Sequence, residues 1–307
     1  MTDTDQRILK TLAYFDIFHY PLLSDEVLQF HGMISTPAII EESLQSLRKD
    51  DLIFFIDGFY ALNNDITLAS KRKKANALAA EQMVIAKRAA KILSKFPYVK
   101  GLAISGSLSK NFGTEKADID FFIITAANRL WIARTIMHLY KKFTFLTGRD
   151  NWFCMNYYVD EAVPGIEEKN IFTAIEIATL LPMYGKTAID NFVLANSWSA
   201  AYFPHSPVVT NNVPETKKGF ISRFTEKIFA YGLGNRIDNQ LMKITGNRWK
   251  KKAERNQKNV KGNPLGMKVS KHCSKPDPKN FQDKVIAAYQ KKLDGLLNRK
   301  TEIRKVG

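Results

Sequence analysis

The chain has 307 residues, enough for two or three domains with separate cores, and its 45% hydrophobic and 25% charged residues are typical of a folded soluble protein. No apolar run approaches the ~20 residues that span a bilayer, and the first residues lack the basic-then-apolar order of a secretory signal, so we expect no membrane insertion. The formal net charge of +16 belongs entirely to the last third, where 24 Lys and Arg stand against 8 Asp and Glu from Pro214 onward.

Residues 1–64 carry three helical patterns and then a hairpin signal. Apolar residues recur at helical spacing in the first and third patterns, and Thr4 or Asp5 is available to cap the first helix. Asp57-Gly58, between two short apolar runs, is typical of a two-residue hairpin turn. Three helices followed by a hairpin resemble a winged-helix domain.

The third of these helices corresponds to the one that enters the DNA groove in winged-helix folds. It carries Glu41 and Glu42 in its leading half, with Arg48 and Lys49 only near its end. Phosphate groups would repel this acidic leading face. We therefore expect a structural or protein-contact role for this domain rather than sequence-specific DNA binding.

Residues 66–96 form one long helical pattern that Pro97 ends, and a strand is expected over residues 98–104. The helix contains the run Lys71-Arg72-Lys73-Lys74. Such a run can contact nucleic acid, but a solvated helical face is the commoner explanation and the one we expect.

Between residues 104 and 125, two apolar runs enclose a Gly-Ser turn and an alternating acid pair. The first run ends in Gly106-Ser107, and Asp118 and Asp120 open the second. Alternate residues of a strand project to the same side, so the two carboxylates are expected to lie together with Ile119 turned away. Neighbouring carboxylates repel each other unless a cation lies between them, and a glycine turn brings backbone N–H groups to a phosphate. The pattern predicts a metal–triphosphate site; a solvated strand edge is the plainer alternative.

An apolar residue, Gly, then Gly or Ser, a short spacer and an acid–apolar–acid triplet resemble the signature of the nucleotidyltransferase superfamily that includes DNA polymerase beta. The resemblance covers roughly residues 85–160, where the expected order of helix, strand, Gly-Ser turn, strand, helix and strand agrees with the minimal core of that superfamily. It implies that Asp118 and Asp120 are catalytic and hold two Mg²⁺ ions.

The same resemblance assigns the nucleotide-binding residues. Gly106 and Ser107 would bind the β and γ phosphates of a nucleoside triphosphate. Lys110 would be a further phosphate contact, with free solvation as its alternative, and Ser109 would assist through its hydroxyl.

The superfamily usually supplies a third carboxylate from the next strand, here expected over residues 152–159, which contain no acid. Asn156 occupies the expected catalytic position, on the same face as Cys154 and Tyr158 by alternation. An amide oxygen can ligate Mg²⁺ but cannot accept a proton at neutral pH. Three options stay open: an enzyme that needs only the first pair, one that recruits Asp160, or a weakened relative that still binds nucleotide.

The rest of the chain is expected to form helices, with a linker at 208–214 and a loop or basic connector at 259–280. Helices are expected over residues 128–146, 167–182, 186–197, 216–231, 236–258 and 278–299. The whole pattern predicts an α+β protein in three parts: a winged-helix-like domain (1–64), a nucleotidyltransferase core with a mixed sheet and a long leading helix (65–207), and a basic helical C-terminal region (208–307).

The basic last third favours a nucleic-acid partner, RNA or DNA, with a solubilising surface as the alternative. Cys154 and Cys273 lack metal-like spacing, which favours a reduced, cytoplasmic setting, and the His272-Cys273 pair predicts no metal site. We therefore expect a magnesium-dependent nucleotidyltransferase that moves a nucleoside monophosphate onto an acceptor hydroxyl, for example an RNA 3′ end. The alternative is a catalytically weakened relative that binds nucleotide or nucleic acid.

Overall fold

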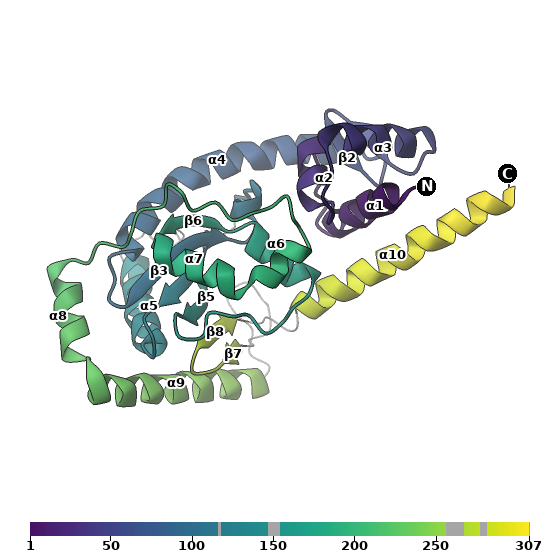
Figure 1. Cartoon of the computed structure of the whole chain (residues 1–307). Helices are drawn as coiled ribbons and strands as arrows, with labels where there is room; N and C mark the ends of the chain where they lie inside the picture. The colour runs from purple at the N-terminus through teal and green to yellow at the C-terminus, as the bar shows by residue number, and fades with distance from the viewer. Residues whose placement is uncertain (116–117, 147–153, 256–266, 277–280, 307) are drawn as a thin grey trace.

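The computed structural model describes residues 1–115, 118–146, 154–255, 267–276 and 281–306. Helices surround a mixed six-stranded sheet, and a small two-stranded sheet lies in the N-terminal part (Figure 1). This arrangement confirms the expected α+β class. No helix among the described residues is long and apolar enough to cross a membrane.

The N-terminal part contains the three helices and the hairpin that the sequence predicts. They are α1 (Asp3–Asp16), α2 (Ser24–Phe30), α3 (Pro37–Lys49), β1 (Phe54–Ile56) and β2 (Phe59–Ala61). Asp57 and Gly58 both have positive φ angles, as the hairpin turn requires. The cap of α1 differs from the expectation, because Thr2 and Asp5 form a reciprocal capping box one turn earlier.

Glu41 of α3 makes structural contacts inside this N-terminal part. Its carboxylate accepts hydrogen bonds from the Ser24 hydroxyl at 3.2 Å and from the Tyr60 hydroxyl at 3.4 Å. The acid therefore ties α3 to α2 and to β2. This agrees with a structural role for at least one of the two leading acids.

Helix α4 (Thr67–Leu93) joins the N-terminal part to the central sheet and confirms the long helix. Arg72, expected on a solvated face, is instead 1% exposed. Its guanidinium donates to Glu26 at 2.6 Å and to the carbonyl of Pro21 at 3.0 Å, and it lies 3.6 Å from the centroid of the Tyr20 ring. Within the charged run, Arg72 alone is buried, whereas Lys71, Lys73 and Lys74 are exposed.

The central sheet has the strand order β6-β3-β4-β5-β8-β7. Its strands are β3 (Val99–Ser105), β4 (Asp120–Thr125), β5 (Cys154–Asp160), β6 (Leu181–Tyr184), β7 (Met267–Val269) and β8 (Cys273–Pro276). β4 and β5 are parallel, and every other neighbouring pair is antiparallel.

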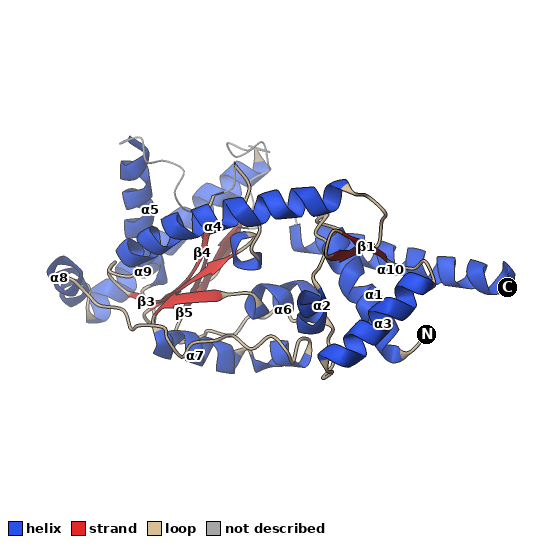
Figure 2. Ribbon diagram, turned by 90° about the horizontal axis from the view of Figure 1, so that it is seen from above, coloured by secondary structure: helices blue, strands red, loops and turns tan. Residues whose placement is uncertain are grey.

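Helices cover both faces of this sheet, so the core has three layers (Figure 2). One face packs on α4, α5 (Leu130–Leu146) and α9 (Tyr231–Glu254), and the other on α6 (Ile171–Ala178) and α7 (Lys186–Ala195). Alternation along β4 supplies both cores, since Phe121 and Ile123 face the first layer while Phe122 and Ile124 face the second.

Three strands arise where the sequence predicts none. β6 begins within the last two residues of the expected helix 167–182 and continues to Tyr184. Its Pro182 is tolerated because β6 is an edge strand. β7 and β8 lie inside the expected connector 259–280 and extend the sheet beyond β5. The division drawn between residues 207 and 208 therefore cuts across the sheet.

The remaining helices are α8 (Phe220–Ile228) and α10 (Phe281–Val306). α10 packs on α1, where the Tyr289 and Tyr14 rings meet edge to face with centroids 5.7 Å apart and Lys292 pairs with Asp16. α8 lies at the end of the molecule opposite the N-terminal part (Figures 1 and 2).

Substitution Arg72→Ala is expected to lower the free energy of unfolding by about 3 kcal/mol, because it leaves Glu26 and the Pro21 carbonyl without their buried donor. Chemical denaturation measures the change. The matched control is Lys74→Ala, whose partner Glu115 is as exposed as the lysine itself, with an expected loss below about 0.5 kcal/mol. Equal losses in the two variants would contradict the anchoring role of Arg72.

Candidate active site

The glycine turn after β3 lies directly against the first residue of β4. Ser105 pairs with Asp120 in the antiparallel ladder, and the next residue, Gly106, has φ +70°. A Cβ added at Gly106 would lie 2.5 Å from Oδ2 of Asp120. Only glycine fits this backbone conformation and this distance. The turn and the acid, distant in sequence, therefore form one site.

Asp120 opens β4, and Asp118 lies just before the strand. Asp118 and Asp120 are half-buried, whereas Ile119 between them is 3% exposed and belongs to the core below α4 and α5. Alternation within β4 places Asp120 on the same side as Phe122, toward the layer of α6 and α7.

Two side chains after the turn donate hydrogen bonds to the Gly106 carbonyl. Residues Leu108–Lys110 form a short 3-10 helix, η1, and the Ser107 carbonyl accepts the N–H groups of Lys110 and Phe112. The Ser109 hydroxyl donates to the Gly106 carbonyl at 2.9 Å, and the Lys110 ammonium donates to the same oxygen at 3.0 Å. Ser109 and Lys110 are therefore held beside the turn that contacts Asp120.

Glu176 of α6 is a part of this site that the sequence did not reveal. Its Oε1 lies 2.8 Å from the Lys110 ammonium, in a pair that is only partly exposed. The available signal was a lone acid in the otherwise apolar helix Ile171–Ala178. Glu176 fixes the direction of the lysine side chain and neutralises its charge while no other anion is present.

Strand β5 contributes Cys154 and, by its backbone, Asn156 to the neighbourhood of the acids. Cys154 pairs directly with Asp120 in the parallel ladder. The register then shifts so that Met155 faces Phe121 and Tyr157 faces Phe122, which leaves Asn156 as a bulge residue. The Asn156 side chain lies outside the described part of the chain.

The bulge changes which side chains of β5 share a face. Tyr158 joins Met155 in the core below α4 and α5, while Tyr157 packs with Phe122 on the α6–α7 side, with ring centroids 5.4 Å apart. Strict alternation along β5 is therefore broken, because Met155 and Tyr158, three residues apart, face the same core.

Asp160 lies at the opposite end of β5 and does not complete the site. It pairs with Thr125, whereas the start of the strand, Cys154, pairs with Asp120. Six residues of extended strand correspond to about 20 Å. The option of an enzyme that recruits Asp160 as its third carboxylate is therefore excluded by the register.

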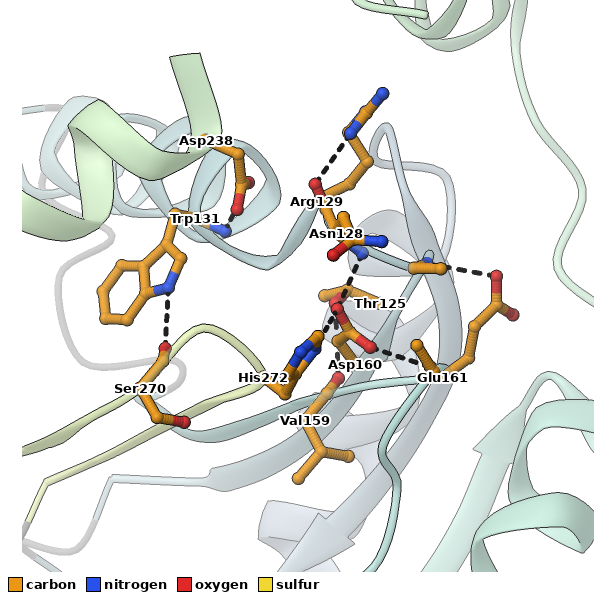
Figure 3. A network of polar contacts seen from close by, with 12 residues as sticks. Thr125, Asn128, Arg129, Trp131, Val159, Asp160, Glu161, Asp238, Ser270 and His272 are labelled. Atoms are coloured by element: carbon orange, nitrogen blue, oxygen red, sulfur yellow. Dashed lines mark hydrogen bonds and ion pairs between the residues drawn. The ribbon is translucent and has the colours of Figure 1, made fainter. Parts of the chain in front are cut away.

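The buried Asp160 carboxylate joins three separate segments of the chain through its hydrogen bonds. The side chain is 0% exposed and accepts from the N–H groups of Asn128 and Ala162, both at 2.7 Å, while Nδ1 of His272 lies 3.0 Å away (Figure 3). His272 comes from the β7–β8 hairpin, so the carboxylate joins that hairpin to the loop before α5. His272, for which the sequence analysis predicts no metal site, is one of its partners.

A second buried carboxylate, Asp238 of α9, caps α5 from outside the helix. Its Oδ1 accepts from the N–H groups of Trp131 and Ile132, both at 2.9 Å, and Figure 3 shows the contact with Trp131. Burial raises the pKa of Asp238 to about 6, although the two N–H groups oppose the shift.

The donor set of the candidate site fits a magnesium ion. Asp118 and Asp120 supply carboxylate oxygens of the kind that Mg²⁺ prefers, and the Gly106 turn lies directly beside the Asp120 carboxylate. No group of three or more His, Cys, Asp or Glu side chains suited to a metal occurs among the described residues. An ion held by the pair would need further ligands from a phosphate substrate or water.

No protein-family model, curated protein or solved structure shows significant similarity to the chain. The functional assignment therefore depends on the residues and their geometry.

Substitution Gly106→Ala is expected to lower the free energy of unfolding by about 2 kcal/mol, because alanine is strained at φ +70° and its Cβ displaces Asp120. The matched control is Gly219→Ala, whose Cβ would meet nothing within 4 Å. Urea denaturation compares the two. Equal stability of the two variants would refute the close approach of the turn to Asp120.

The raised pKa of Asp238 predicts a pH dependence of stability. The folded protein binds a proton on the Asp238 carboxylate more tightly than the unfolded chain does. Protonation of Asp238 therefore contributes its full share to the free energy of unfolding below pH 3.8, and this share is lost as the pH rises through about 6. As the pH rises across this window, the melting temperature of the wild type should therefore fall relative to that of Asp238→Asn. Asp50→Asn, an exposed control, should track the wild type. A pH-independent difference between wild type and Asp238→Asn would contradict the shift.

Proposed function

We propose that the protein is a magnesium-dependent nucleotidyltransferase that transfers a nucleoside monophosphate from a nucleoside triphosphate to an acceptor hydroxyl. The observation that carries this proposal is the contact of the Gly106 turn with the Asp120 carboxylate, where a Cβ would lie 2.5 Å from Oδ2. A phosphate-binding turn and a metal-binding acid must meet in this way if one triphosphate is to touch both. The sequence signature and this contact support the same site.

Each residue has a chemical role in this proposal. Gly106 and Ser107 present the turn to the β and γ phosphates, as glycine turns do at anion sites. Asp118 and Asp120 hold Mg²⁺, which when bound neutralises charge on the triphosphate and on the leaving pyrophosphate. Cys154 pairs with Asp120 and marks where the next strand reaches the site.

Lys110 would exchange its partner within the protein, Glu176, for the phosphate of the substrate. Its ammonium binds Glu176 and the Gly106 carbonyl, beside the turn. A triphosphate on the turn offers a stronger anionic partner at the same place, so Lys110 exchanges Glu176 for phosphate oxygen. Ser109, held on the Gly106 carbonyl, keeps the turn closed during this exchange.

A second candidate function is nucleotide binding without transfer. The register of β5 favours it, since the only acid in the described strand, Asp160, lies at the far end and is fully buried. Asn156 cannot take the acceptor proton. A site with two carboxylates and no base binds a triphosphate and its metal ion and activates the acceptor poorly.

Incubation of the protein with Mg²⁺, labelled nucleoside triphosphates and total RNA tests the first function. We expect label transfer that falls at least about a hundredfold in Asp118→Asn and in Asp120→Asn, because the metal ligands are lost. The matched control Asp50→Asn removes an exposed acid on another element and should retain full transfer. Equal labelling by all variants would rule out this site.

Nucleotide binding separates the two functions. Calorimetry with a triphosphate and Mg²⁺ should show binding that is lost in both aspartate variants. Binding without transfer to any acceptor would support the second function, and the absence of both would contradict the proposals together.

A further inference from the structure

Helix α8 exposes an apolar stripe to solvent. Phe220, Ile221, Phe224 and Ile228 are 84%, 80%, 57% and 47% exposed. The last three lie one, four and eight residues after Phe220, which places all four on one side of the helix. We call these four residues the α8 stripe. A surface helix ordinarily turns such a stripe inward, so its outward direction here requires an explanation.

Polar contacts hold α8 in this inverted orientation. The Glu226 carboxylate accepts the N–H of Tyr98 at 2.6 Å, and the Tyr98 hydroxyl donates to the carbonyls of Thr225 and Glu226. Ser222, on the same side, is 5% exposed. Because the polar side of α8 is fixed to the body, the α8 stripe must face outward.

The charges that border the α8 stripe are all positive. Lys217, Arg223 and Lys227 are exposed, whereas the only acid of the helix, Glu226, is turned toward Tyr98 and Lys218. The outward side of α8 therefore combines large apolar side chains with cations and has no exposed carboxylate.

Helix α9, which follows directly, extends this character. Its 24 residues correspond to about 36 Å, and Leu233 and Ile244 are 55% and 63% exposed. Its acid Asp238 is buried against α5, whereas Glu254, its last residue, is exposed. The exposed cations of α9 are Arg236, Lys243, Arg248, Lys250 and Lys251.

The chemistry of this surface selects its partner. A second copy of the α8 stripe would bring cations against cations. A nucleic acid would satisfy the cations but would gain little from the aliphatic Ile221 and Ile228. A bilayer with anionic headgroups offers both an apolar layer and negative charge, and it fits a protruding helix without needing a matching groove.

We propose that α8 and the exposed face of α9 bind the surface of an anionic membrane. The α8 stripe enters the boundary between headgroups and acyl chains, while Arg223, Lys227 and the cations of α9 contact the headgroups. The chain lies on the bilayer and does not cross it. This inference is independent of the chemistry proposed for the Gly106–Asp120 site.

Flotation of the full chain with vesicles tests the proposal. The probes are vesicles of phosphatidylcholine alone and of phosphatidylcholine mixed with phosphatidylserine. The wild type should float with the mixed vesicles only. The double variant Phe220→Ser/Phe224→Ser should bind them at least about tenfold more weakly because two aromatic side chains no longer enter the apolar layer.

Two further variants make the test specific. Arg223→Glu/Lys227→Glu should also lose binding, since it reverses the charge beside the α8 stripe. The control Ile34→Ser/Leu194→Ser removes side chains that are 79% and 74% exposed elsewhere and should bind like the wild type. Far-ultraviolet circular dichroism and the melting temperature confirm that each variant is folded.

Three results would overturn the proposal. The first is that the wild type does not float with the mixed vesicles, and the second is that the stripe variant floats as well as the wild type. The third is that the wild type binds no vesicle, and that the stripe variant differs from it in molecular mass by light scattering or in RNA binding. In that case the occupant would be a second copy or a nucleic acid.

Discussion

The candidate site depends on one steric constraint, the approach of a bare backbone to a carboxylate. At Gly106 the chain leaves β3 with φ +70° and passes so close to Asp120 that no side chain fits between them. The antiparallel pairing of β3 with β4 sets this distance, because Ser105 faces Asp120 in the ladder. The Gly106 carbonyl then accepts hydrogen bonds from the Ser109 hydroxyl and the Lys110 ammonium. The register of β3 and β4 therefore places the turn against Asp120, and the turn holds Ser109 and Lys110 beside that acid.

The N-terminal part supports this site from behind. The Tyr20 hydroxyl donates to the Lys110 carbonyl, and the Gly113 N–H donates to the Ala75 carbonyl of α4 at 3.0 Å. Tyr20 in turn lies under the Arg72 guanidinium. Helix α4 thus connects two units that the sequence treats as separate domains. The N-terminal part therefore contributes to the position of the loop that carries Lys110.

The sequence predicts features that are encoded locally and misses those that depend on distant partners. Apolar periodicity located α4, and the Asp57-Gly58 turn located the hairpin β1–β2, because neighbouring residues determine both. The Gly-Ser turn and the acid pair were visible for the same reason. Glu176 was missed because only tertiary packing brings α6 to Lys110. The break in alternation along β5 could not be predicted, because only the bulge at Asn156 places Met155 and Tyr158 in the same core.

The β7–β8 hairpin has a consequence for how the chain reaches its fold. β8 covers the edge of β5, where Cys273 pairs with Val159, and the segment between them includes all of α6 through α9. During synthesis, the backbone groups on that edge of β5 stay open until the hairpin has left the ribosome. An open, apolar strand edge invites pairing with other chains. A shortened chain that lacks the hairpin would keep this part of the β5 edge exposed.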